Sequence, residues 1–291
     1  MENNIYWIWF SRIRKIGTIR KQRLLEEFKH PKYIWDLTKS DLLKVNQIGD
    51  ILSEEILRKE YRQGLDNELK YLNKNNIKHI TIQDEEYPEK LRHIYDSPIS
   101  IYCRGNISLL KEFSLAIIGC RENTEYGKVV TNYIGYNLGR EKLVTVSGLA
   151  KGIDSIAHKA TLIGKGKTIA VIGSGLDNIY PKENIKLAEE IVKAGGLIIS
   201  EYPIGTKPLN MNFPARNRII SGLSDGVIVI EAKKKSGTMI TVDFALEQGK
   251  NVFVIPGNLT SKNSEGTNEL IKQGAKCVTC MEDIYEEYKM N

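Results

Sequence analysis

An aspartate and a histidine lie four residues apart in the segment TVSGLAKGIDSIAH, where an apolar run turns into a helical pattern. Asp154 and His158 are residue types that act together as general acid and base when they flank a substrate. Covalent or metal-assisted chemistry also needs a nucleophile or a metal ligand set beside them, and the neighbouring sequence supplies neither. We therefore predict that the two residues support the turn structurally and that the protein is not an enzyme.

Cationic and planar side chains give a stronger chemical signal, because six of them fall within GTKPLNMNFPARNRIIS and others follow earlier apolar runs. Arginine and lysine pair with phosphates, asparagine reads base edges or phosphates, and phenylalanine stacks on a base. This combination is typical of proteins that bind single-stranded nucleic acid. The predicted contacts are Arg121, Lys151, Lys182, Lys207, Asn210, Phe213, Arg216, Asn217 and Arg218.

The stretch FPARNR, taken by itself, has a second interpretation that is equally good. Phe213 then belongs to the hydrophobic core, and the two arginines cap a helix N-terminus or pair with carboxylates. Sequence patterns alone leave both interpretations open.

Glycine-bearing turns close nearly every apolar run: GCRENTEYG, SGLAKGID, GSGLD, KSGTM and PGN. At the carboxyl edge of a parallel sheet such turns lie side by side, where backbone N–H groups and helix N-termini attract anions. Neither the dinucleotide fingerprint nor the P-loop motif occurs among them. We expect an anion-binding edge that uses no cofactor and no metal.

Strands and helices that alternate along the chain must position these turns. The expected strands are 114–119, 142–148, 168–173, 196–202, 225–232 and 250–257, with a possible edge strand at 276–279. The expected helices are 125–139, 153–163, 183–194, 215–222, 238–248 and 266–273. Uniformly apolar strands are buried on both faces, which favours parallel pairing. The predicted fold is therefore α/β, with a doubly wound, mostly parallel Rossmann-like sheet.

Residues 1–78 form a different region, with helical spacing and a net charge of +5 out of the +6 of the whole chain. We expect a small all-helical domain here, with a helix that starts near Asp41 after a Ser40 cap, and Gly49 either ends that helix or bends the chain into the next one. Two short helices around QIGD resemble a helix-hairpin-helix unit, which either binds a nucleic-acid backbone or only packs. Residues 79–113 are predicted to connect this domain to a Rossmann-like domain at 114–291.

Bulk features exclude several protein classes. No apolar run approaches the roughly 20 residues that a membrane span needs, and the N-terminus MENNIYWIWFSRIRKIG has the wrong order for a secretory signal. We expect a cytoplasmic protein without a membrane partner. The pair Cys277 and Cys280 has metal or redox spacing but no second ligand pair, so we predict no metal site.

Five motifs occur in a fixed order over residues 114–276: AIIGCRENTEYG, VSGLAKGIDSIAH, TIAVIGSGLDNIYPKEN, NFPARNRIISGLSDGVIVIEAKKKSGTMITVDFALEQGKNVFVIPG and EGTNELIKQGA. In order and spacing they closely resemble the DNA-processing protein A family (DprA, also called Smf). The resemblance implies a Rossmann-like core that binds single-stranded DNA, forms a homodimer and loads RecA recombinase during natural transformation. Many members carry a C-terminal winged-helix domain, which we expect to be missing here.

The same resemblance implies site residues. Arg121, Lys182, Phe213, Arg216 and Arg218 match side-chain contacts to DNA. Backbone and hydroxyl contacts are implied for Gly119, Ser147, Gly148 and Ser174. The family usually has Ser or Thr where Cys120 stands, so a hydroxyl contact at that position is not expected.

Two further hypotheses come from the C-terminal part of the chain. The segment KSGTMITVDFALEQGKNVFVIPG also resembles nucleotide-handling Rossmann-like enzymes such as phosphoribohydrolases, in which a carboxylate sits beside the ribose. Asp243 and Glu247 are the candidate carboxylates for this alternative. For the homodimer, Leu270 and Ile271 are a candidate contact face, although both are equally compatible with an ordinary core.

Overall fold

The apolar runs expected as strands pair into one sheet in the computed structural model, which describes residues 2–289. The strand order across this sheet is β1-β2-β6-β5-β4-β3-β7-β8-β9. The strands are β1 (Ile77–Thr81), β2 (Ser100–Gly105), β3 (Ser114–Ile118), β4 (Val144–Ser147), β5 (Thr168–Ile172), β6 (Leu197–Ser200), β7 (Gly226–Val229), β8 (Asn251–Val254) and β9 (Lys276–Cys277). Valine and isoleucine dominate the central strands because β-branched side chains pack well on a pleated surface.

Strands β3 to β9 all pair in parallel, whereas β1 and β2 extend the sheet beyond β6 as antiparallel strands. Ile80 lies opposite Ile101, and Cys103 lies opposite Ile199. The predicted α/β class with a mostly parallel, doubly wound sheet is confirmed. The lead-in strands of the predicted connector thus belong to the sheet itself, and the expected edge strand at 276–279 is only two residues long.

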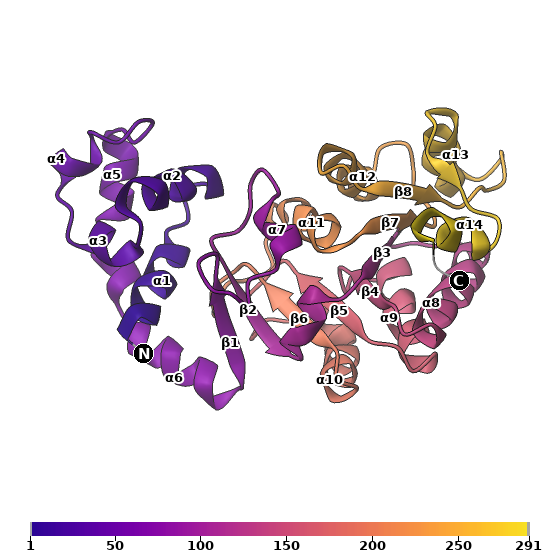
Figure 1. Cartoon of the computed structure of the whole chain (residues 1–291), viewed down its shortest axis with the longest axis horizontal. Helices are drawn as coiled ribbons and strands as arrows, with labels where there is room; N and C mark the ends of the chain where they lie inside the picture. Colours follow the sequence, from indigo (N-terminus) through magenta and orange to yellow (C-terminus); the bar gives the residue numbers. More distant parts are fainter. Residues whose placement is uncertain (1, 290–291) are drawn as a thin grey trace.

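Alternate residues of each strand enter separate cores on the two faces of the sheet. Leu115 and Ile117 face a core with α8 (Glu125–Arg140) and α9 (Ile153–Ile163), whereas Ala116 and Ile118 face α11 (Asn212–Leu223) and α12 (Gly237–Glu247). Helices cover both faces, as Figure 1 shows. The remaining helices of this part are α7 (Glu89–Arg92), α10 (Ile185–Lys193), α13 (Glu265–Lys272) and α14 (Glu282–Tyr285), with 3-10 turns η2 (Ile107–Lys111), η3 (Lys182–Asn184), η4 (Lys262–Ser264) and η5 (Glu286–Tyr288).

Helices alone make up the N-terminal region before β1 (Figure 1). They are α1 (Glu2–Arg12), α2 (Thr18–Phe28), α3 (Pro31–Trp35), α4 (Lys39–Leu42), α5 (Asp50–Ile56), η1 (Lys59–Arg62) and α6 (Leu65–Lys74). The helix expected after Ser40 begins earlier, at Lys39, because Thr38 caps it. The Thr38 hydroxyl accepts from the Asp41 N–H, and the Asp41 carboxylate accepts in return from the Thr38 N–H.

The two short helices around QIGD are α4 and α5. Lys39 pairs with Asp50 at 2.9 Å and with Glu54 at 2.7 Å, so acidic side chains occupy the start of α5. Ile48 and Ile56 are buried between these elements. This arrangement favours the packing interpretation, because a phosphate would meet carboxylates there.

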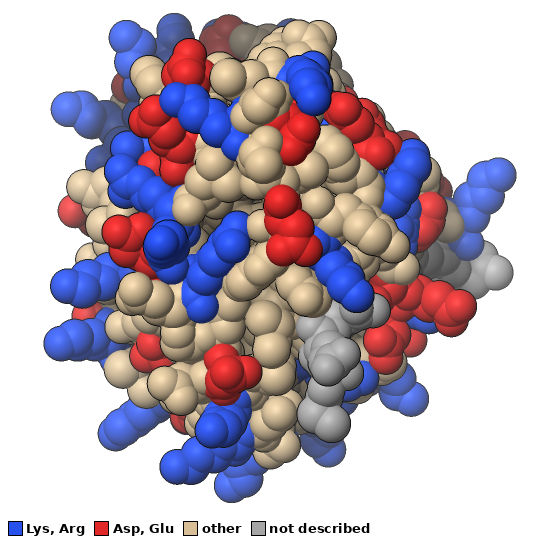
Figure 2. Space-filling view, turned by 90° about the vertical axis from the view of Figure 1, so that its left-hand side faces the viewer, with Lys and Arg blue, Asp and Glu red and all other residues tan. Residues whose placement is uncertain are grey.

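The outer end of the helical region carries charges of both signs. Figure 2 shows lysine and arginine intermixed with aspartate and glutamate on this face rather than gathered by sign. The excess positive charge of residues 1–78 therefore does not form one basic patch on the face shown. Among residues 2–289, no helix is long and apolar enough to cross a membrane.

The strand order reverses at β3. The chain runs outward from β3 through β4 and β5 to β6, then returns to the other side of β3 for β7 and β8. As a result α8, which follows β3, and α12, which follows β7, cover opposite faces of the sheet. A crevice opens at the carboxyl ends of the two neighbouring strands, which is where open α/β sheets bind ligands.

Candidate nucleic-acid interface

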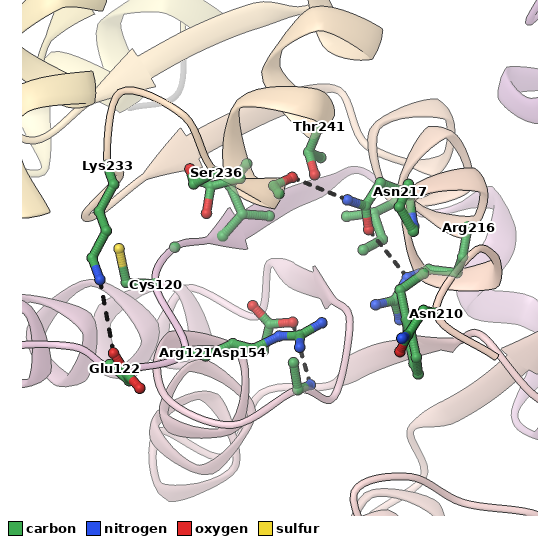
Figure 3. A pocket seen from close by; sticks show the side chains of 18 residues that line it. Cys120, Arg121, Glu122, Asp154, Asn210, Arg216, Asn217, Lys233, Ser236 and Thr241 are labelled. Atoms are coloured by element: carbon green, nitrogen blue, oxygen red, sulfur yellow. Dashed lines mark hydrogen bonds and ion pairs between the residues drawn. The ribbon is translucent and has the colours of Figure 1, made fainter. Parts of the chain in front are cut away.

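A cavity of about 530 Å³ occupies this crevice (Figure 3). Its walls come from the turn after β3, the start of α11 and the start of α12. It therefore gathers chain segments more than 100 residues apart at the edge where anions were expected. The lining residues are Ile118, Gly119, Cys120, Arg121, Glu122, Ala150, Asp154, Asn210, Phe213, Pro214, Arg216, Asn217, Ile220, Lys233, Ser236, Gly237, Thr238 and Thr241.

An arginine and two aromatic rings form a continuous row at this edge. The guanidinium carbon of Arg121 lies 5.7 Å from the centre of the Phe213 ring. The ring of Tyr180, which is 45% exposed, lies 5.7 Å from Phe213 on another side. A cation and exposed rings in contact are the components that hold an unpaired base and its phosphate. Tyr180 was not identified in the sequence, although it sits in the YPKEN turn that supplied Lys182.

Arg216 lines the cavity but is 4% exposed, so it is not the free surface cation that was expected. Its Nη1 donates to the carbonyl of Gly148 at 2.7 Å and to that of Val171. Burial lowers the pKa of the Arg216 guanidinium to about 10, and the Asp154 charge opposes that shift. Burial likewise raises the pKa of Asp154 while Arg216 opposes it. Arg216 thus contributes a fixed positive charge in the wall of the cavity.

Arg218 is 3% exposed and does not line the cavity, so its predicted DNA contact, which stays a prediction, would require the side chain to leave its present partners. Its guanidinium forms two parallel bonds of 2.7 Å to Glu201 and lies 2.9 Å from Asp96. Burial opposes its charge, but Glu201 outweighs burial and the pKa of Arg218 is raised. The reason is helical geometry: residues 216 and 218 project from different sides of α11, and both sides are covered. FPARNR thus buries both arginines and leaves Phe213 half-buried at the edge.

The two serines expected to contact DNA are also buried. The Ser147 hydroxyl donates to the Ile117 carbonyl at 2.7 Å, and the Ser174 hydroxyl donates to the Asn178 carbonyl at 2.6 Å. The first bond joins β4 to β3 and the second closes the turn after β5, so neither hydroxyl faces solvent. Gly148 is equally enclosed, since a Cβ at this position would meet the Asp154 carboxylate and the Arg216 guanidinium.

The three predicted lysines, Lys151, Lys182 and Lys207, are all exposed. The Lys151 ammonium is 2.8 Å from the Glu183 carboxylate, which directly follows Lys182. The amide of Asn184 donates to the Leu149 and Ala150 carbonyls and so ties the turn after β5 to the turn after β4. Lys207 is exposed in the segment between β6 and α11 but does not line the cavity.

The KSGTM turn and the start of α12 contribute one whole wall, in which no contact residue was predicted from the sequence. Lys233, Ser236, Thr238 and Thr241 all line the cavity. The sequence feature that could have indicated this wall is the KSGTM turn. It follows β7, which pairs with β3. Recognising it required the strand order, which the sequence alone does not specify.

Of the residues expected to have supporting or alternative roles, Asp154 lines the cavity, whereas His158, Asp243 and Glu247 do not. His158 is fully buried, and its Nδ1 lies 2.6 Å from the Thr168 hydroxyl. Asp243 and Glu247 are exposed on α12 and do not line the cavity. The phosphoribohydrolase alternative therefore lacks the carboxylate that it placed beside the ribose.

The two candidate dimer residues on α13 differ in burial. Leu270 is 4% exposed within the cluster that contains Val254 and Ala245, and Ile271 packs against the same cluster. The Leu270 side chain thus fills the space between α13 and the sheet, whereas Ile271 keeps part of its surface exposed, and the predicted contact to a second copy stays a prediction.

Comparison with known proteins places this geometry in a family. The family model of DNA recombination-mediator protein A matches residues 78–289. DNA processing protein DprA of Bacillus subtilis is 47% identical over 212 residues, which cover 72% of this chain and 71% of that protein. DprA of Streptococcus pneumoniae is 40% identical over 268 residues, covering 87% of this chain and 94% of that protein.

Solved structures agree with the sequence matches. The crystal structure of DprA from S. pneumoniae superposes with a TM-score of 0.83 at 38% identity, over 97% of both chains. DNA processing protein A from Helicobacter pylori, whose structure was described for its single-stranded DNA binding mode, gives a TM-score of 0.66 at 36% identity, over 72% of this chain and 95% of that one. The chain therefore belongs to the DNA recombination-mediator protein A family, that of the DprA and Smf proteins.

Proposed function

We propose that this protein binds single-stranded DNA along the edge that carries Arg121, Phe213, Tyr180 and Lys182, without catalysis. The observation that carries the proposal is the contact row of Arg121, Phe213 and Tyr180 beside a cavity at the strand-order reversal. The rings offer stacking surfaces that tolerate any base, and the cations neutralise phosphates. The single-stranded DNA binding described for the H. pylori relative supports the same ligand class.

Further parts of the proposal rest on family membership. We propose that the bound strand is passed to RecA recombinase during natural transformation, which places the protein in the cytoplasm. A homodimer would join two binding edges and raise avidity for a long strand. With Leu270 in the core, we expect a second copy to contact exposed apolar residues such as Val129 and Leu259. The molar mass in light scattering tests this dimer.

Substitution at the edge tests the binding site. We expect Arg121→Ala and Lys182→Ala each to weaken binding of fluorescent oligo-dT in anisotropy titrations, because each removes a phosphate partner. Each loss should also reduce the slope of log affinity against log salt by about 0.7. The matched control is Lys111→Ala, since Lys111 is an exposed lysine before the amino end of β3, at the opposite edge of the sheet.

Two results would contradict the proposal. One is unchanged oligo-dT affinity in both edge variants. The other is a loss of the same size in the Lys111→Ala control, which would indicate a diffuse charge effect instead of a site.

A further inference from the structure

The segment between β6 and α11, residues 201–211, leads from the sheet to the binding edge. Asn210 in this segment lines the cavity, and Phe213 follows it in the first turn of α11. Residues 209–211 are all exposed, so this end of the segment packs little against the rest of the protein. The position of Asn210 therefore depends on how the first part of the segment is held.

Two carboxylates from separate parts of the chain bind consecutive N–H groups in that first part. The N–H of Ile204 donates to Oε1 of Glu68, a residue of α6 in the N-terminal helical region, at 3.4 Å. The N–H of Gly205 donates to both carboxylate oxygens of Asp177 at 3.0 Å. The chain turns tightly here, because Gly205 has a φ of +82°, a conformation that favours glycine in a turn.

The turn at 203–206 is also bonded to the turn after β5, which carries Tyr180 of the aromatic row. Asp177 belongs to that second turn, and the Gly175 N–H donates to the Thr206 carbonyl at 2.9 Å. The two turns therefore exchange hydrogen bonds in both directions. A displacement of residues 203–206 would be passed on to the turn that holds Tyr180.

Glu68 is itself held firmly. Its side chain is 3% exposed, and Arg12 donates to it from Nε at 2.8 Å and from Nη2 at 2.5 Å. The Nη1 atom of Arg12 donates in addition to the Gln63 carbonyl at 2.6 Å. Ile204 packs against the apolar cluster that contains side chains of both the helical region and the sheet. Buried polar networks that are well satisfied rigidify the segments they join.

We infer that Glu68 is a positioning residue for the DNA-binding edge. Through the Ile204 N–H it fixes the turn at 203–206, and this turn fixes the segments that carry Asn210 and Tyr180. The helical region then contributes to DNA binding through Glu68 although Glu68 does not line the cavity. This inference rests on the proposed function, since the edge is the one proposed to bind the strand.

Replacement of Glu68 by alanine tests the inference. We expect Glu68→Ala to raise the Kd for oligo-dT about fivefold, because the strand must then order the loosened segment itself. The slope of log affinity against log salt should stay as in the parent, since no phosphate partner is lost. The direction is diagnostic, because removal of a negative charge would by itself favour DNA binding.

Glu55→Ala is the matched control. The Glu55 side chain is also 3% exposed, and its partners Lys15, Arg58 and Tyr61 all belong to the helical region. This variant should lose a similar amount of stability and still bind oligo-dT like the parent. An equal loss of affinity in Glu55→Ala would indicate general loosening of the helical region and overturn the inference.

Asp177→Ala decides the test if Glu68→Ala does not fold. Asp177 is exposed, so its removal leaves the core intact. Loss of its bonds to the Gly205 N–H should also weaken binding, although a negative charge is removed. Asp177→Asn keeps an acceptor oxygen for this N–H and should restore the affinity of the parent.

Hydrogen–deuterium exchange without DNA measures the positioning directly. Peptides covering residues 203–211 and 174–180 should exchange faster in Glu68→Ala than in Glu55→Ala, because only the first variant loses a partner of the 203–206 turn. Equal exchange in the two variants would overturn the inference whatever their affinities.

The outcomes separate this inference from the proposed function. If Glu68→Ala and Asp177→Ala bind as tightly as the parent while Arg121→Ala is weakened, the positioning role is overturned and the binding edge stands. If Glu68→Ala exchanges faster and binds more weakly while Arg121→Ala binds like the parent, the positioning role stands and the contact assigned to Arg121 fails.

Discussion

At the scale of the residue, His158 is a potential general acid or base that is instead fully buried and hydrogen-bonded to Thr168. The Thr168 hydroxyl donates to the Thr145 carbonyl at 2.7 Å, so its proton is committed. Nδ1 of His158 must therefore donate to that hydroxyl, which assigns the tautomer from the network. Nε2 is then an acceptor in a fully buried site, with no partner among residues 2–289. Burial, together with the charge of Arg216, lowers the pKa of His158 to about 3, and the ring stays neutral.

This neutral ring makes stability depend on pH. Below about pH 6.5 the unfolded chain takes up a proton that the folded His158 refuses, so stability is complete above that pH and falls until about pH 3. The share of His158 is about 2 kcal/mol between pH 7 and pH 5. We expect His158→Asn, which retains a donor toward Thr168 and does not titrate, to lose that share. Urea unfolding at both pH values measures it, and an unchanged difference between them would refute the assignment.

At the scale of the element, one side of α11 lines the cavity and another packs against the rest of the fold. Phe213 and Asn217 line the cavity, whereas Arg218 is held by Glu201 and Asp96. We expect Arg218→Ala to destabilise the protein by about 3–5 kcal/mol, because it leaves a carboxylate without its partner. The measurement is thermal unfolding alongside oligo-dT titration of the folded variant.

The variant to compare with Arg218→Ala is Arg121→Ala. Arg121 is exposed, and its guanidinium contacts the Phe213 ring at the edge of the cavity. Arg121→Ala should lose DNA affinity with little change in melting temperature. Arg218→Ala should have a lower melting temperature and keep its DNA affinity. A folded Arg218→Ala variant that loses affinity as Arg121→Ala does would restore Arg218 to the binding site.

Helices and strands could be predicted from the sequence where the local hydrophobic pattern matches the burial seen in the structure. Strands β3 to β8 follow from apolar runs, and the turns after them from glycine. The faces of α11 were not predictable, because FPARNR fits an exposed helix start and a buried one equally well. The wall at α12 needed the pairing of β7 with β3, a contact between residues more than 100 positions apart. Periodicity reports which side of a helix is apolar but not which distant strand lies beside it.

At the scale of the whole molecule, the helical region and the sheet share one core. A single cluster of buried apolar side chains includes Trp9 and Phe10 of α1, Tyr102 of β2 and Ile198 of β6. Polar contacts between the two parts reinforce it: the Ser11 and Ser100 hydroxyls lie 2.8 Å apart, and the Gln22 side chain donates to the Ser97 carbonyl at 2.8 Å. The predicted boundary near residue 78 is therefore crossed by core packing.

The tryptophans allow a test of this coupling. All three, Trp7, Trp9 and Trp35, lie in the N-terminal region, so their fluorescence reports on that region alone. Because the core is shared, we expect the fluorescence transition in urea to coincide with the transition in far-UV circular dichroism, which is dominated by the larger part. An earlier fluorescence transition would show that the helical region unfolds by itself.

The C-terminal border of the sheet limits how two copies can associate. Strand β9 offers only Lys276 and Cys277, and the Lys276 ammonium is tied to Glu287 at 3.0 Å. So short a strand has too few free backbone groups to continue the hydrogen-bond ladder into another molecule. Any assembly on that side must be built from side-chain packing, which makes it sensitive to single apolar-to-charged substitutions and protects the protein from open-ended stacking into fibres.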